Sequence, residues 1–384
     1  MTKFSLRAAT AAIFLGTAAV ATAGALTITT AQAATVRPEV GKALQEAVSL
    51  AKDGKGSAAL AQVRKAEGVS KLTSDERKAI AQTKDYIAAK TGSGSADSAA
   101  GAKAKFAADY NARRYSQVIN EDAALLKKYG VFDSQSQLIV AQAYYLTGNY
   151  AGAIRYLRQS GLNTQQKLEL MLSAAYKGGD NDARREALEQ LVLRYNKPEY
   201  WKDLIRAAEH TKGLSDHQTF DLLRLRLLTN TMQGANDYSL AAQLALQLKL
   251  PAEAKSIMEK GFAAKVLTGE RSIRLSKLVN AQATKDAGAL AGEQKRAMAS
   301  PTGDALVAYG EDLLGYDRAK DAVAAFHAGI KKGVKDKDAA QMVLGQAHLA
   351  AGDKSAALHA FNAVKTDKNT KMVAHIWSIY ARTH

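Results

Sequence analysis

The sequence predicts an all-α protein built as a right-handed solenoid of helix-turn-helix repeats, with a capping helix at the C-terminus. The main observation is a fixed step of 35 residues near the C-terminus, where Gly310 and Phe326 recur as Gly345 and Phe361. A period of this length is typical of stacked helical hairpins. In addition, apolar residues recur at i, i+3 and i+4 along the chain, and strand signals are nearly absent.

Residues 1–33 have the pattern of a secretory signal peptide. Lys3 and Arg7 precede an apolar, Ala-rich run, and Ala31-Gln32-Ala33 offers the small residues that signal peptidase requires. The apolar run is short and interrupted by Gly and Thr, so it would barely span a bilayer. We therefore expect cleavage near Ala33, a periplasmic protein, and no stable membrane insertion of the mature chain.

The segment 34–90 predicts an α-helical hairpin region. Asp53-Gly54 is expected to form the turn of an Ala-rich hairpin, with Ala59 and Val63 in its second helix. Ser74 is expected to open a further helix, because acidic residues follow in the first turn. The small, polar residues at 91–101 predict a flexible linker that separates this region from the main array at 102–384.

The main array divides into hairpin units of about 34 residues. Gly148-Asn149 shows how a unit turns, since Gly accepts the left-handed backbone that ends a helix. The four prolines fall just before or at the start of expected helices, where a missing N–H costs little. The expected units are 102–129, 134–160, 165–195, 199–229, 236–262, 270–297, 303–330 and 337–364, followed by a capping helix at 370–382.

This pattern resembles the tetratricopeptide repeat (TPR), most closely in 134–160, 303–330 and 337–364. In TPR arrays the first helix of each unit lines an inner groove that holds a partner. The resemblance therefore implies a scaffold or adaptor for protein–protein interaction. Carried over by register, the candidate partner-binding residues are Gln142, Tyr145, Tyr176, Lys202, Arg206, Gln243, Glu311 and Gln346.

The order of motifs after residue 190 is similar to that of exported TPR proteins that accompany TonB-dependent outer-membrane uptake. This resemblance implies an envelope protein as the partner, with components of the TonB system as the first candidates. The motifs that carry it include Tyr200-Trp201, Gly329-Ile330-Lys331-Lys332-Gly333, Leu344-Gly345 and the closing Trp377.

The sequence contains no pattern that predicts a catalytic, cofactor or metal site. It has no Cys, and none of its seven His residues has the spacing of a zinc site. Neither a Gly-x-Ser-x-Gly motif in a strand context nor a phosphate-binding loop is present. We therefore predict no enzymatic activity and no cofactor. Two carboxylates from distant hairpins would still permit an envelope glycan-processing enzyme, which is our third hypothesis.

The chain is basic, with a formal net charge of +16, and removal of residues 1–33 with Lys3 and Arg7 leaves +14. The excess is spread along the sequence instead of forming one stripe, which argues against nucleic acid as a partner. Ten of the 15 tyrosines lie between Tyr110 and Tyr200, where packing between helices or a binding surface would explain them. Charge and tyrosines together support the alternative hypothesis, binding or assembly of an anionic cell-wall or surface polysaccharide.

Overall fold

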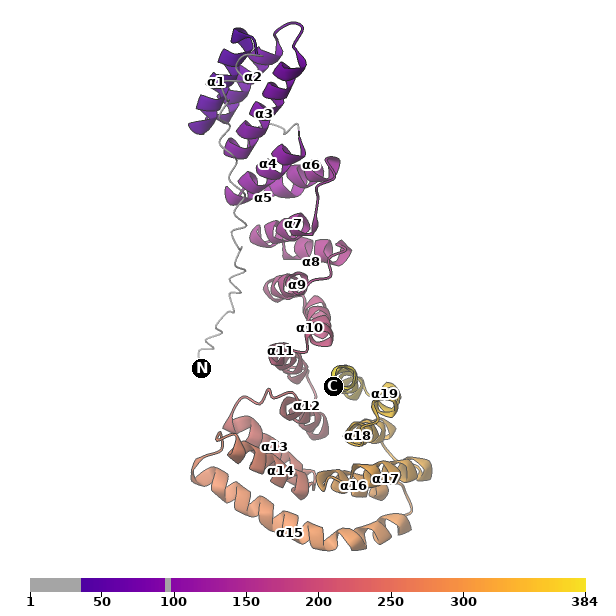
Figure 1. Cartoon of the computed structure of the whole chain (residues 1–384). Helices are drawn as coiled ribbons and strands as arrows, with labels where there is room; N and C mark the ends of the chain where they lie inside the picture. The colour runs from indigo at the N-terminus through magenta and orange to yellow at the C-terminus, as the bar shows by residue number, and fades with distance from the viewer. Residues whose placement is uncertain (1–35, 94–97) are drawn as a thin grey trace. The chain divides into compact units, whose positions relative to one another are not determined.

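The computed structural model describes residues 36–93 and 98–384, and within them every regular element is a helix (Figure 1). This confirms the all-α prediction. The expected signal peptide, residues 1–33, and residues 94–97 of the expected linker lie outside the described residues. No helix in the described part of the chain is both long and apolar enough to cross a membrane. The chain forms two compact units, which divide after Leu162.

Unit 1 begins with three helices that share one apolar core. Ala59 and Val63 are fully buried in it, and Gly54, with φ +75°, forms the hairpin turn as expected. Thr73 caps the third helix through a reciprocal capping box with Glu76. The helices of unit 1 are α1 (Pro38–Lys52), α2 (Gly56–Glu67), α3 (Ser74–Thr91), α4 (Ala99–Asn111), α5 (Tyr115–Gln117), the π-helical turn η1 (Val118–Asp122), α6 (Ala123–Lys128), α7 (Ser134–Leu146) and α8 (Tyr150–Gln159).

Helix α3 ends at Thr91 and α4 begins at Ala99, so both extend into the expected linker at 91–101, and the two helices pack against each other. A buried charge cluster then ties α4 to η1. The Lys105 ammonium donates to Asp109 at 2.6 Å and to Asp122 at 2.8 Å. Burial raises the pKa of the Asp122 carboxyl to about 6, although Lys105 opposes the shift. The cluster fixes a helix whose π turn departs from regular α-helical pairing.

Unit 2 contains five two-helix hairpins, a long single helix and a C-terminal helix. Its helices are α9 (Gln165–Gly178), α10 (Asn181–Tyr195), α11 (Pro198–Glu209), α12 (Asp216–Leu228), α13 (Ala235–Gln247), α14 (Pro251–Ala263), α15 (Gly269–Ala299), α16 (Asp304–Gly315), α17 (Ala319–Lys332), α18 (Lys337–Ala350), α19 (Lys354–Asn362) and α20 (Lys368–Thr383). Each hairpin lies where the sequence period places a unit, which confirms the repeat.

The 35-residue step has a direct packing basis. Gly310 in α16 lies against the ring of Phe326 in α17, and Gly345 in α18 lies in the same way against Phe361 in α19. A methyl group at either glycine would overlap the ring. The glycines therefore recur because the two helices of each hairpin approach closely at this point.

One expected hairpin is absent. Residues 270–297 form the interior of α15, an uninterrupted helix of 31 residues, so the prediction of a two-helix unit there is wrong. Gly288, inside that stretch, has a helical backbone, and no turn forms around it. A single Gly costs a helix only about 1 kcal/mol, and the many Ala residues of α15 offset that cost.

The C-terminal helix does more than cap the last hairpin. Besides α18 and α19, α20 packs against α10, α11 and α12, about 160 residues earlier in the chain. Trp201 and Trp377 are buried in this shared core, and the Trp377 indole donates to the Asp221 carbonyl at 3.3 Å. Unit 2 is therefore closed upon itself, because its last helix completes the core of its second hairpin.

Candidate partner-binding site

An open cavity of about 410 Å³ lies between the first turns of α11 and the loop after α12. Pro198 begins α11, where it lacks only an N–H that a helix start leaves unpaired. At the other side, Asn230 with φ +55° and Gly234 with φ +117° turn the chain from α12 into α13. The cavity is lined by Pro198, Glu199, Lys202, Asn230, Thr231, Met232 and Gln233.

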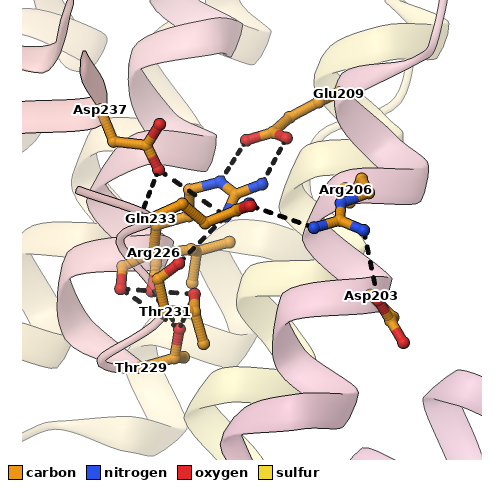
Figure 2. A network of polar contacts seen from close by, with 9 residues as sticks. Asp203, Arg206, Glu209, Arg226, Thr229, Thr231, Gln233 and Asp237 are labelled. Atoms are coloured by element: carbon orange, nitrogen blue, oxygen red, sulfur yellow. Dashed lines mark hydrogen bonds and ion pairs between the residues drawn. The ribbon is translucent and has the colours of Figure 1, made fainter. Parts of the chain in front are cut away.

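Arg226 holds the loop side of this cavity in place (Figure 2). Its guanidinium is nearly fully buried and forms a two-point pair with Glu209 of α11, at 2.5 and 2.6 Å. It also donates to the Thr231 carbonyl at 3.0 Å, within the loop itself. Burial works against its charge, but the Glu209 carboxylate outweighs it and raises the pKa of Arg226. The loop is thus fixed to the α11–α12 hairpin by a charged, buried side chain.

A second set of contacts fixes the outer part of the same loop. Asp237 accepts a hydrogen bond from the Gln233 backbone N–H at 2.8 Å, and Arg206 donates to the Gln233 side-chain oxygen at 3.1 Å. Arg206 also lies 3.9 Å from Asp203 (Figure 2). The loop is held by Arg226 and Arg206. The cavity therefore presents the Lys202 ammonium and the Glu199 carboxylate from α11 and the amides of Asn230 and Gln233 from the loop. Such groups can bind the polar backbone or side chains of a polypeptide.

A polar cluster joins α12 to α14, α16 and α18 on the other side of α12. Arg224 makes two short bonds to Glu253, at 2.6 and 2.7 Å, and donates to Gln346 at 2.9 Å. Gln346 in turn donates to Asp221 at 2.7 Å. Burial raises the pKa of Glu311 to about 7, and nearby Arg224 only partly opposes this shift. The cluster stabilises the closed arrangement of unit 2, since it links helices that are distant in sequence.

Within the described residues, one group of carboxylates is close enough together to hold a metal ion: Asp286, Glu293 and Asp312. The Tyr316 hydroxyl donates to Asp286 at 2.8 Å. Burial, followed by the charges of Asp286 and Glu293, raises the pKa of Asp312 to about 8. A protonated Asp312 relieves the repulsion among the three carboxyl groups at neutral pH.

The eight residues carried over from the TPR groove occupy different environments. In unit 1, Gln142 is buried and accepts a hydrogen bond from Tyr110, whereas Tyr145 is half-buried against the ring of Tyr150. In unit 2, Tyr176 is 53% exposed and Gln243 is exposed. The role of all these residues in partner binding stays a prediction.

The structure brings two pairs of the carried-over residues together. Lys202 and Arg206 lie on α11 beside the cavity and its loop. Glu311 and Gln346 lie near Arg224, where Gln346 is already engaged in the polar cluster. Gln346 is buried because unit 2 is closed: α20 packs against both α18 and α12, so α18 does not line an open groove.

The sequence reasoning missed the residues that shape the cavity and the polar cluster. Asp221, Arg224 and Arg226 lie on α12, the second helix of its hairpin, whereas only first-helix positions were carried over. A signal for them is nevertheless present. These three charged residues interrupt the apolar run 220–228, and charges in such a run need buried partners.

Comparison with known proteins adds little to the structural description. No protein-family model matches the sequence, and no curated protein matches it either. Among solved structures, the chain is similar to the crystal structure of the APC/C hetero-tetramer Cut9-Hcn1, with 12% identity over 79% of this chain and 67% of that chain. The TM-score is 0.22, too low to bear on the argument. On the basis of its own stacked hairpins, the chain is an all-α, TPR-like repeat protein.

Proposed function

We propose that this protein is a non-catalytic TPR-type scaffold that binds another protein at the cavity between α11 and the loop after α12. The observation that carries the proposal is the fixed loop: Arg226 and Arg206 hold Thr231 and Gln233 at the edge of a 410 Å³ cavity. A loop that is already ordered loses little conformational entropy when a partner binds. The cavity is therefore suited to recognition of a polypeptide segment.

The chemistry of the lining indicates what such a segment would offer. Lys202 would pair with an acidic side chain or a carbonyl, and Glu199 would accept from a backbone N–H or a basic side chain. Asn230 and Gln233 add amides that both donate and accept. A polar segment with both charges suits this lining better than an apolar helix.

We further propose that the partner is an envelope protein and that the scaffold acts in the periplasm, as an accessory to TonB-dependent uptake. The support is the signal-peptide pattern of residues 1–33 and the similarity of the motifs after residue 190 to exported TPR proteins of that system. Components of the TonB system are therefore the first partners to test.

The experiment is affinity capture from periplasmic extract with a photo-crosslinking residue at position 202. A matched crosslinker at position 331, exposed on α17, serves as the control. We expect one envelope protein to crosslink from 202 and not from 331. We also expect the Arg226→Met variant, in which the loop is released, to lose the product. Equal labelling from both positions, or no envelope protein at all, would contradict the proposal.

An anionic cell-wall polymer is the alternative partner, supported by the net charge of +14 without residues 1–33 and by the tyrosines between Tyr110 and Tyr200. Co-sedimentation with purified peptidoglycan decides between the two. Binding that falls with salt and is lost in Lys202→Glu, but not in Lys331→Glu, would assign the cavity to the polymer instead of a protein.

A further inference from the structure

Helix α15 presents an unusually large free surface. It packs on α13, α14 and α16 along one side only, and Figure 1 shows it as a long arc at the edge of unit 2. Among its 31 residues, only Ser272, Val279, Ala283 and Ala297 are buried. Its remaining sides are therefore available to a partner over many turns.

The outward side of α15 is strongly basic. Successive residues of a helix are separated by 100°, which places the cations on the side opposite buried Val279 and Ala283. All six cations of α15 are exposed, five of them on this outward side, whereas the two central carboxylates of the helix, Asp286 and Glu293, lie on the inward side near Asp312. The cations of this outward row are Arg274, Lys277, Lys285, Lys295 and Arg296.

Three cations of the row lack any partner. Glu270 pairs with Arg274 at 2.9 Å and Glu293 approaches Arg296 at 3.5 Å. Lys277, Lys285 and Lys295 form no ion pair within the described parts of the chain. The three span 18 residues, or about 27 Å of helix. On α15 itself the cations therefore form one stripe, because Asp286 and Glu293 lie on the inward side and the lysines on the outward side.

The surface between the lysines is flat. Ala281, Gly288 and Ala291 are all exposed there, and a Cβ atom added at Gly288 would meet no atom of another segment within 4 Å. The glycine therefore has no packing role inside the protein. Small residues allow another helix to approach closely, and lysines on either side would pair with its carboxylates. A helix that lies in a bilayer surface instead needs bulky Trp, Phe or Leu along its centre. The exposed large apolar side chains of α15, Ile273, Leu278 and Met298, all lie outside the stretch between Lys285 and Lys295.

We propose that the outward side of α15 binds an acidic helix of a protein partner, with Lys277, Lys285 and Lys295 as the specificity-determining charges. Charge complementarity selects an acidic partner, and the small residues select a helix. The proposal does not depend on the cavity at α11, which lies at the α11–α12 hairpin and offers different chemistry.

The test measures binding of a fluorescent Glu/Ala-rich helical peptide of about 20 residues, long enough to cover the row. The full chain is compared with Lys277→Gln/Lys285→Gln/Lys295→Gln. The matched control is Lys320→Gln/Lys331→Gln/Lys354→Gln, which removes the same charge from exposed positions on α17 and α19. At low ionic strength we expect the α15 variant to bind about tenfold more weakly and the control to change less than about twofold.

Two further measurements test the shape of the partner. Gly288→Gln fills the flat centre without a clash inside the fold, and we expect it to weaken the helical peptide about threefold or more. A peptide of the same composition interrupted by proline should bind wild-type protein more weakly and respond little to Gly288→Gln. Circular dichroism confirms that each variant is folded.

Three outcomes would overturn the proposal. The first is an equal loss of binding in the α15 and control variants, which would indicate diffuse charge. The second is equally tight binding of the proline-interrupted peptide. The third is tighter binding to phosphatidylglycerol vesicles or polyphosphate than to the helical peptide, which would assign the row to lipid or to a flexible polyanion.

Discussion

The hairpins α16–α19 and the region α11–α15 are built on different principles. The first are joined by apolar seams in which Gly310 meets Phe326 and Gly345 meets Phe361. The second is joined by buried arginines, since Arg224 and Arg226 leave α12 on opposite sides and pair with Glu253 and Glu209. Each glycine–phenylalanine contact lies within one hairpin, so its residues recur with the period of the repeat. Each buried ion pair joins one particular pair of helices and has no equivalent in the next hairpin. The candidate cavity lies in the second region, where the repeat is least regular.

The largest effect should come from the apolar seam of the regular hairpins. Phe326 is fully buried, and we expect Phe326→Ala to lower the free energy of unfolding by about 3–5 kcal/mol, because it leaves a cavity. Phe361→Ala, at the equivalent position, should fall in the same range. Denaturant unfolding measures both. The control Lys331→Ala changes an exposed residue on the same helix as Phe326 and should change the free energy of unfolding by less than about 0.5 kcal/mol. A larger change would mean that any substitution on α17 is destabilising, whether or not it removes apolar packing.

This seam is also the part of the molecule that the sequence predicts best. The spacing of Gly310, Phe326 and their repeats locates the C-terminal hairpins almost to the residue, because both packing partners lie in one hairpin. The closure of unit 2 could not be predicted in this way. It depends on contacts such as Trp377 with the Asp221 carbonyl, which join segments about 160 residues apart and occur once.

The candidate site shows the same limit. Register places Lys202 and Arg206 beside the cavity, but the loop that completes it is held by Arg226, on a helix that the TPR resemblance gave no reason to inspect. Continuation of the 34-residue step predicted a hairpin at 270–297, where the structure has the long helix α15. Gly288 in this helix has no packing around it, unlike Gly310, and packing is a property of the fold.

The second effect tests the polar principle. We expect Arg226→Met to lower the free energy of unfolding by about 2–3 kcal/mol, since Glu209 loses its partner but can turn toward water. The double variant with Glu209→Met should recover part of this loss. Arg206→Met removes an exposed contact to the same loop and should cost less than about 1 kcal/mol. Equal costs for the two arginines would mean that Arg226 does not hold the loop.

A third effect is the pH dependence that Glu311 contributes in the polar cluster around Arg224. Burial raises the pKa of Glu311 from its ordinary value near 4.5 to about 7, so the folded state retains a proton that the unfolded state releases. This contribution to stability is complete below about pH 4.5 and is lost as the pH rises through 7.

Glu311→Gln removes the titration. Unfolding curves at pH 5 and pH 8 should therefore show the variant gaining on wild type by on the order of 1 kcal/mol, because water reaches the half-buried carboxyl and screens part of the shift. A constant difference at the two pH values would contradict it.

The smallest effect distinguishes Gly288, which has free space around it, from Gly310, which packs against a phenylalanine ring. Gly288 lies in the interior of α15 with free space around it, so Gly288→Ala should stabilise the protein by about 0.5–1 kcal/mol through helix propensity alone. The same change at Gly310 gains the same propensity but drives a methyl group into the ring of Phe326, and overpacking of this kind costs about 1–3 kcal/mol. Thermal and denaturant unfolding of the two variants should therefore shift in opposite directions. If both variants are more stable, the close approach of α16 and α17 does not require glycine at position 310. If both are less stable, Gly288 makes a packing contact in solution that the structure does not show.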